Sequence, residues 1–275
     1  MSACPITTIR RSVGGGIVAV LYGIFAYAVF LVTILYAIGF VGNLWVPKSI
    51  DTGDSAPLLS ALNINIALLS LFAVQHSVMA RPAFKRWWTR LVPMSVERST
   101  YVIFASVALM VLYWQWQPLP APVWIIENGA GRFALNGLFW FGWTLVFAST
   151  FLINHFELFG LRQVFARATN RAIPAPTFRT PLLYRVVRHP LYLGFLIAFW
   201  STPDMTAGHF VFAIGTTGYI LLAIVLEERD LIDTFGEQYR RYRRSVPMLL
   251  PRPSRKGVAG AFTGSRSQPP STRRI

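Results

Sequence analysis

The chain has little charge for its length and only one cysteine. Of its 275 residues, 13% are charged and 54% are apolar, whereas a soluble globular protein carries about 25% charged residues. This scarcity of charge excludes an ordinary soluble domain. The single thiol, Cys4, excludes a disulfide framework and a cysteine-based metal site within one chain.

Long apolar segments occupy most of the sequence, and a helix needs about 20 residues to cross a hydrocarbon core of roughly 30 Å. Six segments are found, at residues 16–42, 57–79, 99–117, 134–159, 191–203 and 208–227. The fifth is short, and we expect it to start deeper in the membrane or to extend back through Leu182. A tight turn at residues 202–204 joins it to the sixth. The sequence predicts an all-α polytopic membrane bundle of five to six transmembrane segments that ends in a helical hairpin.

Basic residues follow the alternation of these segments. The net charge is +15, and all 26 Lys and Arg residues except Lys48 and Arg132 fall in alternate loops or near the termini. The positive-inside rule then places both termini in the cytoplasm. We expect the protein to lie in a bacterial inner membrane. Because topology explains the charge, we expect no nucleic-acid partner.

The last residues differ from the rest of the chain in composition. Residues 1–250 are predicted to form one integral-membrane domain. Residues 251–275 are rich in Pro, Gly, Ser and Arg, which predicts a disordered basic cytoplasmic tail. Anionic headgroups of membrane lipids are its expected contact. The sequence does not determine an oligomeric state.

Polar residues cluster at the segment ends that share the predicted cytoplasmic face. Ionisable groups at membrane depth are candidates for function, although each could instead be a structural hydrogen-bond or ion-pair partner. Three histidines are among them, but none has His-x-x-x-His spacing, so no metal is expected. The hairpin brings its two mouths together, which suits a zwitterionic cofactor with a cationic centre. The clusters are Gln75 with His76, Asn154 with His155 and Glu157, Arg188 with His189, and Glu227 with Glu228.

Two sets of motifs carry a family resemblance. The C-terminal set resembles the integral-membrane methyltransferases, which include isoprenylcysteine carboxyl methyltransferase and phospholipid N-methyltransferases: Arg188-His189-Pro190-x-Tyr192-x-Gly194, Glu227-Glu228-x-x-Leu231 and Phe235-Gly236-x-x-Tyr239-x-x-Tyr242. The upstream set, at residues 75–82, 97–101 and 154–163, is similar to the NnrU-related methanethiol S-methyltransferases. Together they cover most of residues 70–250.

This resemblance implies S-adenosylmethionine as the methyl donor. That molecule carries a carboxylate, an ammonium and a sulfonium. Arg and His can bind the carboxylate and Glu the ammonium, while aromatic faces suit adenine or the sulfonium and glycine allows close approach of the cofactor to a helix backbone. The residues implied for the cofactor site are Gln163, Tyr184, Arg188, His189, Pro190, Tyr192, Gly194, Glu227 and Glu228.

The resemblance also implies methanethiol as acceptor and dimethyl sulfide as product. A thiol has a pKa of about 8.5 or higher, and the thiolate is the nucleophile. The site should therefore help remove a proton. Candidate catalytic residues are His76 or His155 as the base, with Glu97 or Glu157 to orient the imidazole. The residues implied for substrate binding are Gln75, Arg98, Tyr101 and Asn154.

Other functions remain open at this point. The first is a membrane methyltransferase acting on a prenylcysteine or an amino lipid. The second is a membrane sterol-type reductase that uses NADPH. The third is a non-enzymatic NnrU-like membrane protein of nitrogen-oxide metabolism, such as a haem or electron-transfer anchor.

Overall fold

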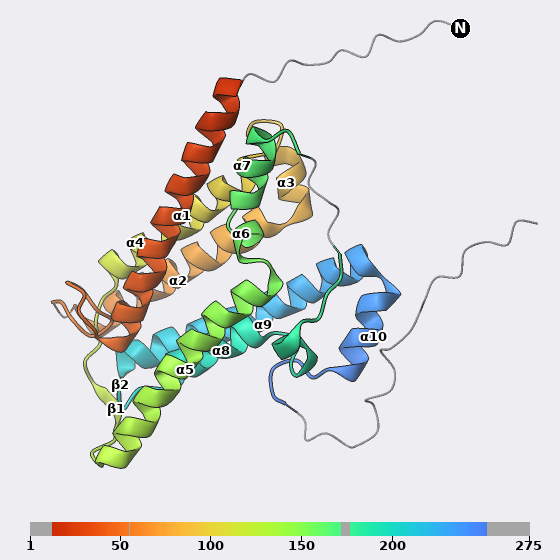
Figure 1. The fold of residues 1–275 in the computed structure, drawn as a ribbon. Coiled ribbons are helices and arrows are strands. Elements are labelled where there is room, and N and C mark those ends of the chain that lie inside the picture. The colour runs from red at the N-terminus through yellow and green to blue at the C-terminus, as the bar shows by residue number, and fades with distance from the viewer. Residues whose placement is uncertain (1–12, 55, 172–176, 252–275) are drawn as a thin grey trace, which may run out of the picture.

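A computed structural model describes residues 13–54, 56–171 and 177–251 (Figure 1). The all-α prediction is confirmed, with one two-stranded antiparallel ribbon as the β structure of these ranges. Most of the predicted tail, and Cys4, lie outside them. The elements are α1 (Val13–Gly42), α2 (Leu58–Ala80), α3 (Pro82–Trp88), α4 (Glu97–Gln115), β1 (Pro122–Ile125), α5 (Gly129–Ile153), α6 (His155–Leu158), α7 (Leu161–Ala168), the 3₁₀ helix η1 (Leu182–Arg185), α8 (Pro190–Trp200), β2 (Asp204–Thr206), α9 (Ala207–Phe235) and α10 (Glu237–Ser245).

Four helices, α1, α2, α5 and α9, are long and apolar enough to cross a membrane. They leave large apolar side chains exposed, such as Leu21 on α1, Leu71 on α2 and Leu222 on α9. Such faces suit contact with lipid tails, since every backbone polar group of a helix is satisfied internally. The predicted third segment corresponds to α4, which has 19 residues and begins with Glu97 and Arg98.

The predicted fifth segment is shorter still. Its helix, α8, has 11 residues, which cover about 16 Å at 1.5 Å per residue. The expectation that this helix extends back through Leu182 is wrong, because η1 ends at Arg185 and α8 starts at Pro190. A proline disfavours helical conformation in the residue before it, and His189 is accordingly non-helical, with φ −127° and ψ 62°.

Two groups of helices pack side by side (Figure 1). In one group, α4 contacts both α1 and α2, and α1 contacts α7. In the other, α8 lies between α5 and α9, and α9 also contacts α2. A core of aromatic residues joins the groups near the end where β1 and β2 pair. It includes Phe40, Trp116, Phe139, Trp143 and Phe212.

The contact between α5 and α8 is close enough that the two backbones touch. A Cβ atom added at Gly194 would lie 2.8 Å from both the carbonyl oxygen of Gly142 and the amide nitrogen of Val146. Small residues permit this kind of approach between membrane helices. Gly194 was expected to admit the cofactor to a helix backbone. The structure instead uses its missing side chain for the packing of α8 on α5.

Candidate active site

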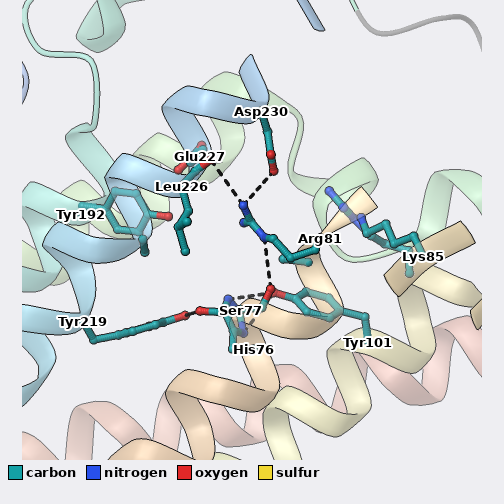
Figure 2. A pocket seen from close by; sticks show the side chains of 13 residues that line it. His76, Ser77, Arg81, Lys85, Tyr101, Tyr192, Tyr219, Leu226, Glu227 and Asp230 are labelled. Atoms are coloured by element: carbon teal, nitrogen blue, oxygen red, sulfur yellow. Dashed lines mark hydrogen bonds and ion pairs between the residues drawn. The ribbon is translucent and has the colours of Figure 1, made fainter. Parts of the chain in front are cut away.

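A polar cavity of about 250 Å³ lies at the end of the bundle opposite the β1–β2 ribbon, between α2, α3 and α4 on one side and α8 and α9 on the other (Figure 2). Its volume lies just below the range of about 300–1,000 Å³ that is typical of ligand sites. It is lined by His76, Ser77, Ala80, Arg81, Lys85, Arg98, Tyr101, Tyr192, Tyr219, Ala223, Leu226, Glu227 and Asp230.

Hydrogen bonds connect the cavity-lining side chains of α2 to both walls. The hydroxyl of Tyr101 lies 2.8 Å from Nε2 of His76, which links α4 to α2. The hydroxyls of Ser77 and Tyr219 lie 3.3 Å apart and link α2 to α9. The last turn of α2 is thus fixed between the two helix groups, and it carries the imidazole at the cavity.

Arg81, the residue that follows α2, closes the cavity on one side. Its Nη1 lies 3.0 Å from Oδ2 of Asp230 and donates to the carbonyl oxygen of Leu226 at 3.3 Å, while Nε donates to the carbonyl oxygen of Ser77. Asp230 stands three residues after Glu227, so both carboxylates lie on one face of α9. Arg81 neutralises the carboxylate of Asp230.

Lys85 lies one turn after Arg81, on α3. Its ammonium forms no hydrogen bond or ion pair within the described ranges, although it borders the cavity. Burial lowers the pKa of Lys85, and the nearby guanidinium groups of Arg98 and Arg81 lower it further, against the opposing effect of Glu97 and Asp230. Both effects disfavour the charged form of an amine.

The two mouths of the predicted hairpin do meet, but largely through the protein's own charges. Glu228 accepts from Nε of Arg188 at 2.7 Å, lies 3.1 Å from Nε2 of His189 and is 3.0 Å from Nε of Arg243 on α10. The Glu228 side chain is 7% exposed and the Glu227 side chain 44%. Adjacent positions on a helix point in different directions, so Glu228 faces this buried cluster and Glu227 faces the cavity.

Backbone pairing strengthens this cluster. The amide nitrogens of Arg188 and His189 donate to the carbonyl oxygens of Pro247 and Met248, at 2.9 and 3.2 Å. Nη1 of Arg188 also donates to the carbonyl oxygens of Arg243 and Val246. The segment that follows α10 is therefore attached to the start of α8.

The aromatic residues of the C-terminal motif form a second support. Tyr239 and Tyr242 pack edge-on against Phe178, and the hydroxyl of Tyr242 donates to the carbonyl oxygen of Tyr184. Burial raises the pKa of Tyr242 to about 12 and raises the pKa values of Tyr184 and Tyr239 as well. These phenols stay protonated near neutral pH. The hydroxyls of Tyr184 and Tyr239 are buried without a partner among the residues described.

His155 lies away from the cavity. Its Nε2 is 2.7 Å from the hydroxyl of Tyr27 and its Nδ1 is 2.9 Å from Oγ1 of Thr150, so both ring nitrogens are engaged. The ring stacks on Phe151 with centroids 4.2 Å apart, and burial lowers the pKa of His155. The neighbouring Glu157 binds Asn154 and Arg162. This arrangement joins α1, α5 and α6.

The structure thus separates the predicted site residues into two sets. Those that border the cavity are His76, Arg98, Tyr101, Tyr192 and Glu227. Those outside its lining are Gln75, Glu97, Asn154, His155, Glu157, Gln163, Tyr184, Arg188, His189, Pro190, Gly194 and Glu228. Among the residues outside the lining, Pro190 starts α8, and Gln163 donates a long hydrogen bond to the carbonyl oxygen of Glu157. Gln75 contacts Met79.

Five polar cavity residues were not among the predicted site residues. Ser77 and Arg81 belong to the upstream motif at residues 75–82, and Lys85 to a basic loop that marks topology, but the sequence alone assigns none of them a role at the site. Their spacing could have identified them, because Arg81 and Lys85 are four residues apart and Asp230 follows Glu227 by three. The five residues are Ser77, Arg81, Lys85, Tyr219 and Asp230.

Replacing His155 with alanine should lower stability and leave turnover nearly unchanged. The change removes two hydrogen bonds and leaves the hydroxyl of Tyr27 without its partner, while Thr150 keeps its bond to the carbonyl oxygen of Phe147. An unpaired polar group costs about 1–3 kcal/mol when it is buried. Thermal unfolding in detergent and the rate of the methyl transfer that the sequence resemblance implies would be measured together. A normal melting temperature with a strongly reduced rate would instead make His155 part of the chemistry.

No group of three or more His, Cys, Asp or Glu side chains that could hold a metal ion occurs within residues 13–54, 56–171 and 177–251. The cavity's cations, carboxylates and phenols are groups that bind a small charged ligand. The fold and the cavity together define a helical integral-membrane protein with a polar site of the kind that an enzyme needs.

The chain belongs to the methanethiol S-methyltransferases. It is 59% identical to the methanethiol S-methyltransferase of Mycobacterium tuberculosis over 86% of this chain and 97% of that protein. It is 57% identical to methanethiol S-methyltransferase 2 of Bradyrhizobium diazoefficiens over 84% of this chain and 89% of that protein. These relatives do not favour the prenylcysteine, amino-lipid or non-enzymatic alternatives.

A more distant similarity covers less of the sequence. The chain is 30% identical to Nurim of Rattus norvegicus over 63% of this chain and 69% of that protein. No protein-family model matches the chain. No solved structure matches it either.

Proposed function

We propose that this protein methylates methanethiol to dimethyl sulfide with S-adenosylmethionine as the methyl donor. Membership of the methanethiol S-methyltransferase family carries this proposal, because the M. tuberculosis relative aligns over 97% of its length at 59% identity. The cavity supplies residue types that suit both reactants. The donor supplies an activated methyl group, and the protein's task is to position and deprotonate the thiol.

The cavity's side chains fit the charges of S-adenosylmethionine. Glu227 borders the cavity, and within the described part of the chain its one ion pair is a contact of 3.9 Å with His189, so it can bind the ammonium. Within the described part of the chain, Arg98 donates a hydrogen bond through Nε to the carbonyl oxygen of Leu158. Its terminal nitrogens are left for the carboxylate of the donor. The rings of Tyr192 and Tyr219 can face the sulfonium.

This assignment changes the predicted role of the Arg-His pair. Arg188 and His189 were expected to bind the carboxylate directly. Both instead bind Glu228 in the structure. We assign them to holding the start of α8 against α9, which sets the positions of Tyr192 and Glu227.

The acceptor would occupy the side formed by α2, α3 and α4. Ala80 of α2, with Ala223 and Leu226 of the opposite wall on α9, provides apolar contact for the methyl group of methanethiol. His76 with its Tyr101 partner borders the same space. By the positive-inside rule this end faces the cytoplasm, and both termini then lie on that side of the inner membrane. The donor would enter from the cytoplasm.

A headspace assay tests the proposal. Membranes containing the protein, supplied with S-adenosylmethionine and methanethiol, should release dimethyl sulfide. Glu227→Gln should weaken binding of the donor about 10- to 150-fold, which corresponds to the 1.5–3 kcal/mol of a lost charge-assisted hydrogen bond. Isothermal titration calorimetry measures this affinity.

Glu237→Gln is the matched control for that variant. Glu237 lies on α10 with its side chain 51% exposed, and its ion pairs with arginines are on the surface, where such pairs contribute little. Release of dimethyl sulfide and donor affinity should match those of the unaltered protein. Equal donor affinity in the Glu227 and Glu237 variants would overturn the assignment of Glu227.

A further inference from the structure

We propose that Lys85 is the catalytic residue that accepts the proton of the thiol. The inference rests on the proposed function, and it names a group outside the candidates that the sequence suggested for this step. It is drawn from the position of Lys85 at the cavity, from the charges around it and from the engagement of the other side chains there.

The position of Lys85 follows from a sharp turn between two helices. Arg81 leaves α2 in an extended conformation, with φ −71° and ψ 139°, and Pro82 begins α3. This turn brings Lys85, one helical turn later, back to the cavity. Figure 2 shows Lys85 beyond Arg81, on the side away from Tyr192 and Tyr219. Lys85 therefore lies on the acceptor side, away from the two tyrosines proposed to face the sulfonium.

The charged groups around Lys85 act on its pKa in both directions. Arg98 on α4 and Arg81 at the start of α3 oppose a positive charge at Lys85. The acids that would favour it are Glu97 on α4 and Asp230 on α9. Asp230 is engaged by Arg81 at 3.0 Å, so its influence is offset. The other titratable groups of the lining have no comparable opposing effect on the pKa of Lys85. They are His76, Tyr101, Tyr192, Tyr219 and Glu227.

The other side chains of the cavity are less suited to the step. Arginine stays protonated under all ordinary conditions. The carboxylates of Glu227 and Asp230 have reference pKa values near 4, far below that of a thiol. Nε2 of His76 already has the hydroxyl of Tyr101 at 2.8 Å. Lys85 is the amine of the lining, and it has no bonded partner among the residues that the structure describes.

Proton affinity points to the same residue. A general base works best when its pKa is close to that of the group it deprotonates and to the working pH. Thiols titrate near about 8.5 and free lysine near about 10.4. Burial and the two guanidinium groups lower the pKa of Lys85, which moves it toward the thiol. The pKa of an ordinary histidine, about 6.5, lies below that of the thiol rather than above it.

The step balances as a simple displacement. The S–H proton of methanethiol moves to the Lys85 amine, and the resulting thiolate sulfur forms a bond to the activated methyl carbon. The bond between that carbon and the donor sulfur breaks, and its electron pair stays on the donor sulfur. Lys85 then releases the proton to water, and no oxidant or reductant is needed.

The test compares Lys85→Gln with Lys85→Arg. Arginine keeps the positive charge and length but cannot act as a base. Both variants should therefore lose turnover about 10²–10⁴-fold near neutral pH, the usual loss for a general base. Affinity for S-adenosylmethionine, measured by calorimetry, should stay within about twofold, since the loss is in the chemical step. Arg86→Gln, an exposed change on the same helix, is the control and should behave like the unaltered protein.

The dependence of the rate on pH is the second measurement. In the unaltered protein the rate should fall as pH drops through the pKa of Lys85, because protonation removes the base. In both variants the defect should shrink at alkaline pH, where the thiol ionises without help. An active Lys85→Arg variant would show that only charge is needed, and a defect unaffected by pH would show a structural role; either result overturns the inference. Absence of dimethyl sulfide from the unaltered protein would overturn the proposed function too.

Discussion

Replacing Arg188 with alanine is expected to lower the free energy of unfolding by about 3–5 kcal/mol, the usual loss when one partner of a buried ion pair is removed. The side chains of Arg188 and Glu228 are 9% and 7% exposed, and the guanidinium also holds the carbonyl oxygens of Arg243 and Val246. The change would weaken the attachment of α10 to α8, leaving the backbone pairing with residues 247 and 248. Thermal unfolding in detergent measures the effect, and we expect turnover to be lost with it.

Two further variants make this test specific. Arg185→Ala removes an exposed arginine three residues earlier, and surface changes of this kind usually stay within about 0.5 kcal/mol. The double variant Arg188→Met with Glu228→Gln should recover part of the stability, because no buried charge is left without its partner. Normal unfolding of Arg188→Ala with a loss of donor affinity would instead support the direct binding role that the sequence suggested.

Replacing Gly194 with alanine should destabilise the protein by about 3 kcal/mol, the upper part of the range for overpacked cores. The added Cβ would meet backbone atoms of α5 at 2.8 Å, and backbone atoms cannot rotate away as a side chain can. Gly218→Ala in α9 is the matched control. Nothing lies within 4 Å of a Cβ added there, so it should stabilise the helix by about 0.5–1 kcal/mol.

The comparison of these two glycine variants separates packing from binding. Thermal unfolding reports the packing of α8 on α5, and calorimetry with S-adenosylmethionine reports the site. If Gly194→Ala unfolds normally but binds the donor poorly, the glycine serves the cofactor after all.

The helices could be predicted from the sequence because apolar length is a local property. The start of α8 could not be predicted in this way. It depends on Pro190 and on the pairing of Arg188 and His189 with the backbone at residues 247 and 248. That pairing spans more than 50 residues of sequence. It becomes visible only when the chain returns from α10.

The sequence predicts several residues of the site correctly, but it predicts their individual roles less well. The hairpin does bring Arg188, His189 and Glu228 together. Composition does not tell whether a carboxylate binds its own chain or a ligand, and Glu227 and Glu228 differ only in the direction in which each points from α9. His155 illustrates the same limit, because its partner Tyr27 lies 128 residues away.

The cavity lies between two separate stretches of the chain. Residues 76–101 form one wall and residues 192–230 the other. In the proposed reaction the first wall serves the acceptor, apart from Arg98, which is assigned to the donor carboxylate, and the second wall serves the donor. Substitutions in the first stretch at positions other than Arg98 can then alter which nucleophile is accepted without disturbing donor recognition. We expect acceptor preference in this family to diverge mainly through the N-terminal half, while the residues that bind the donor stay the same.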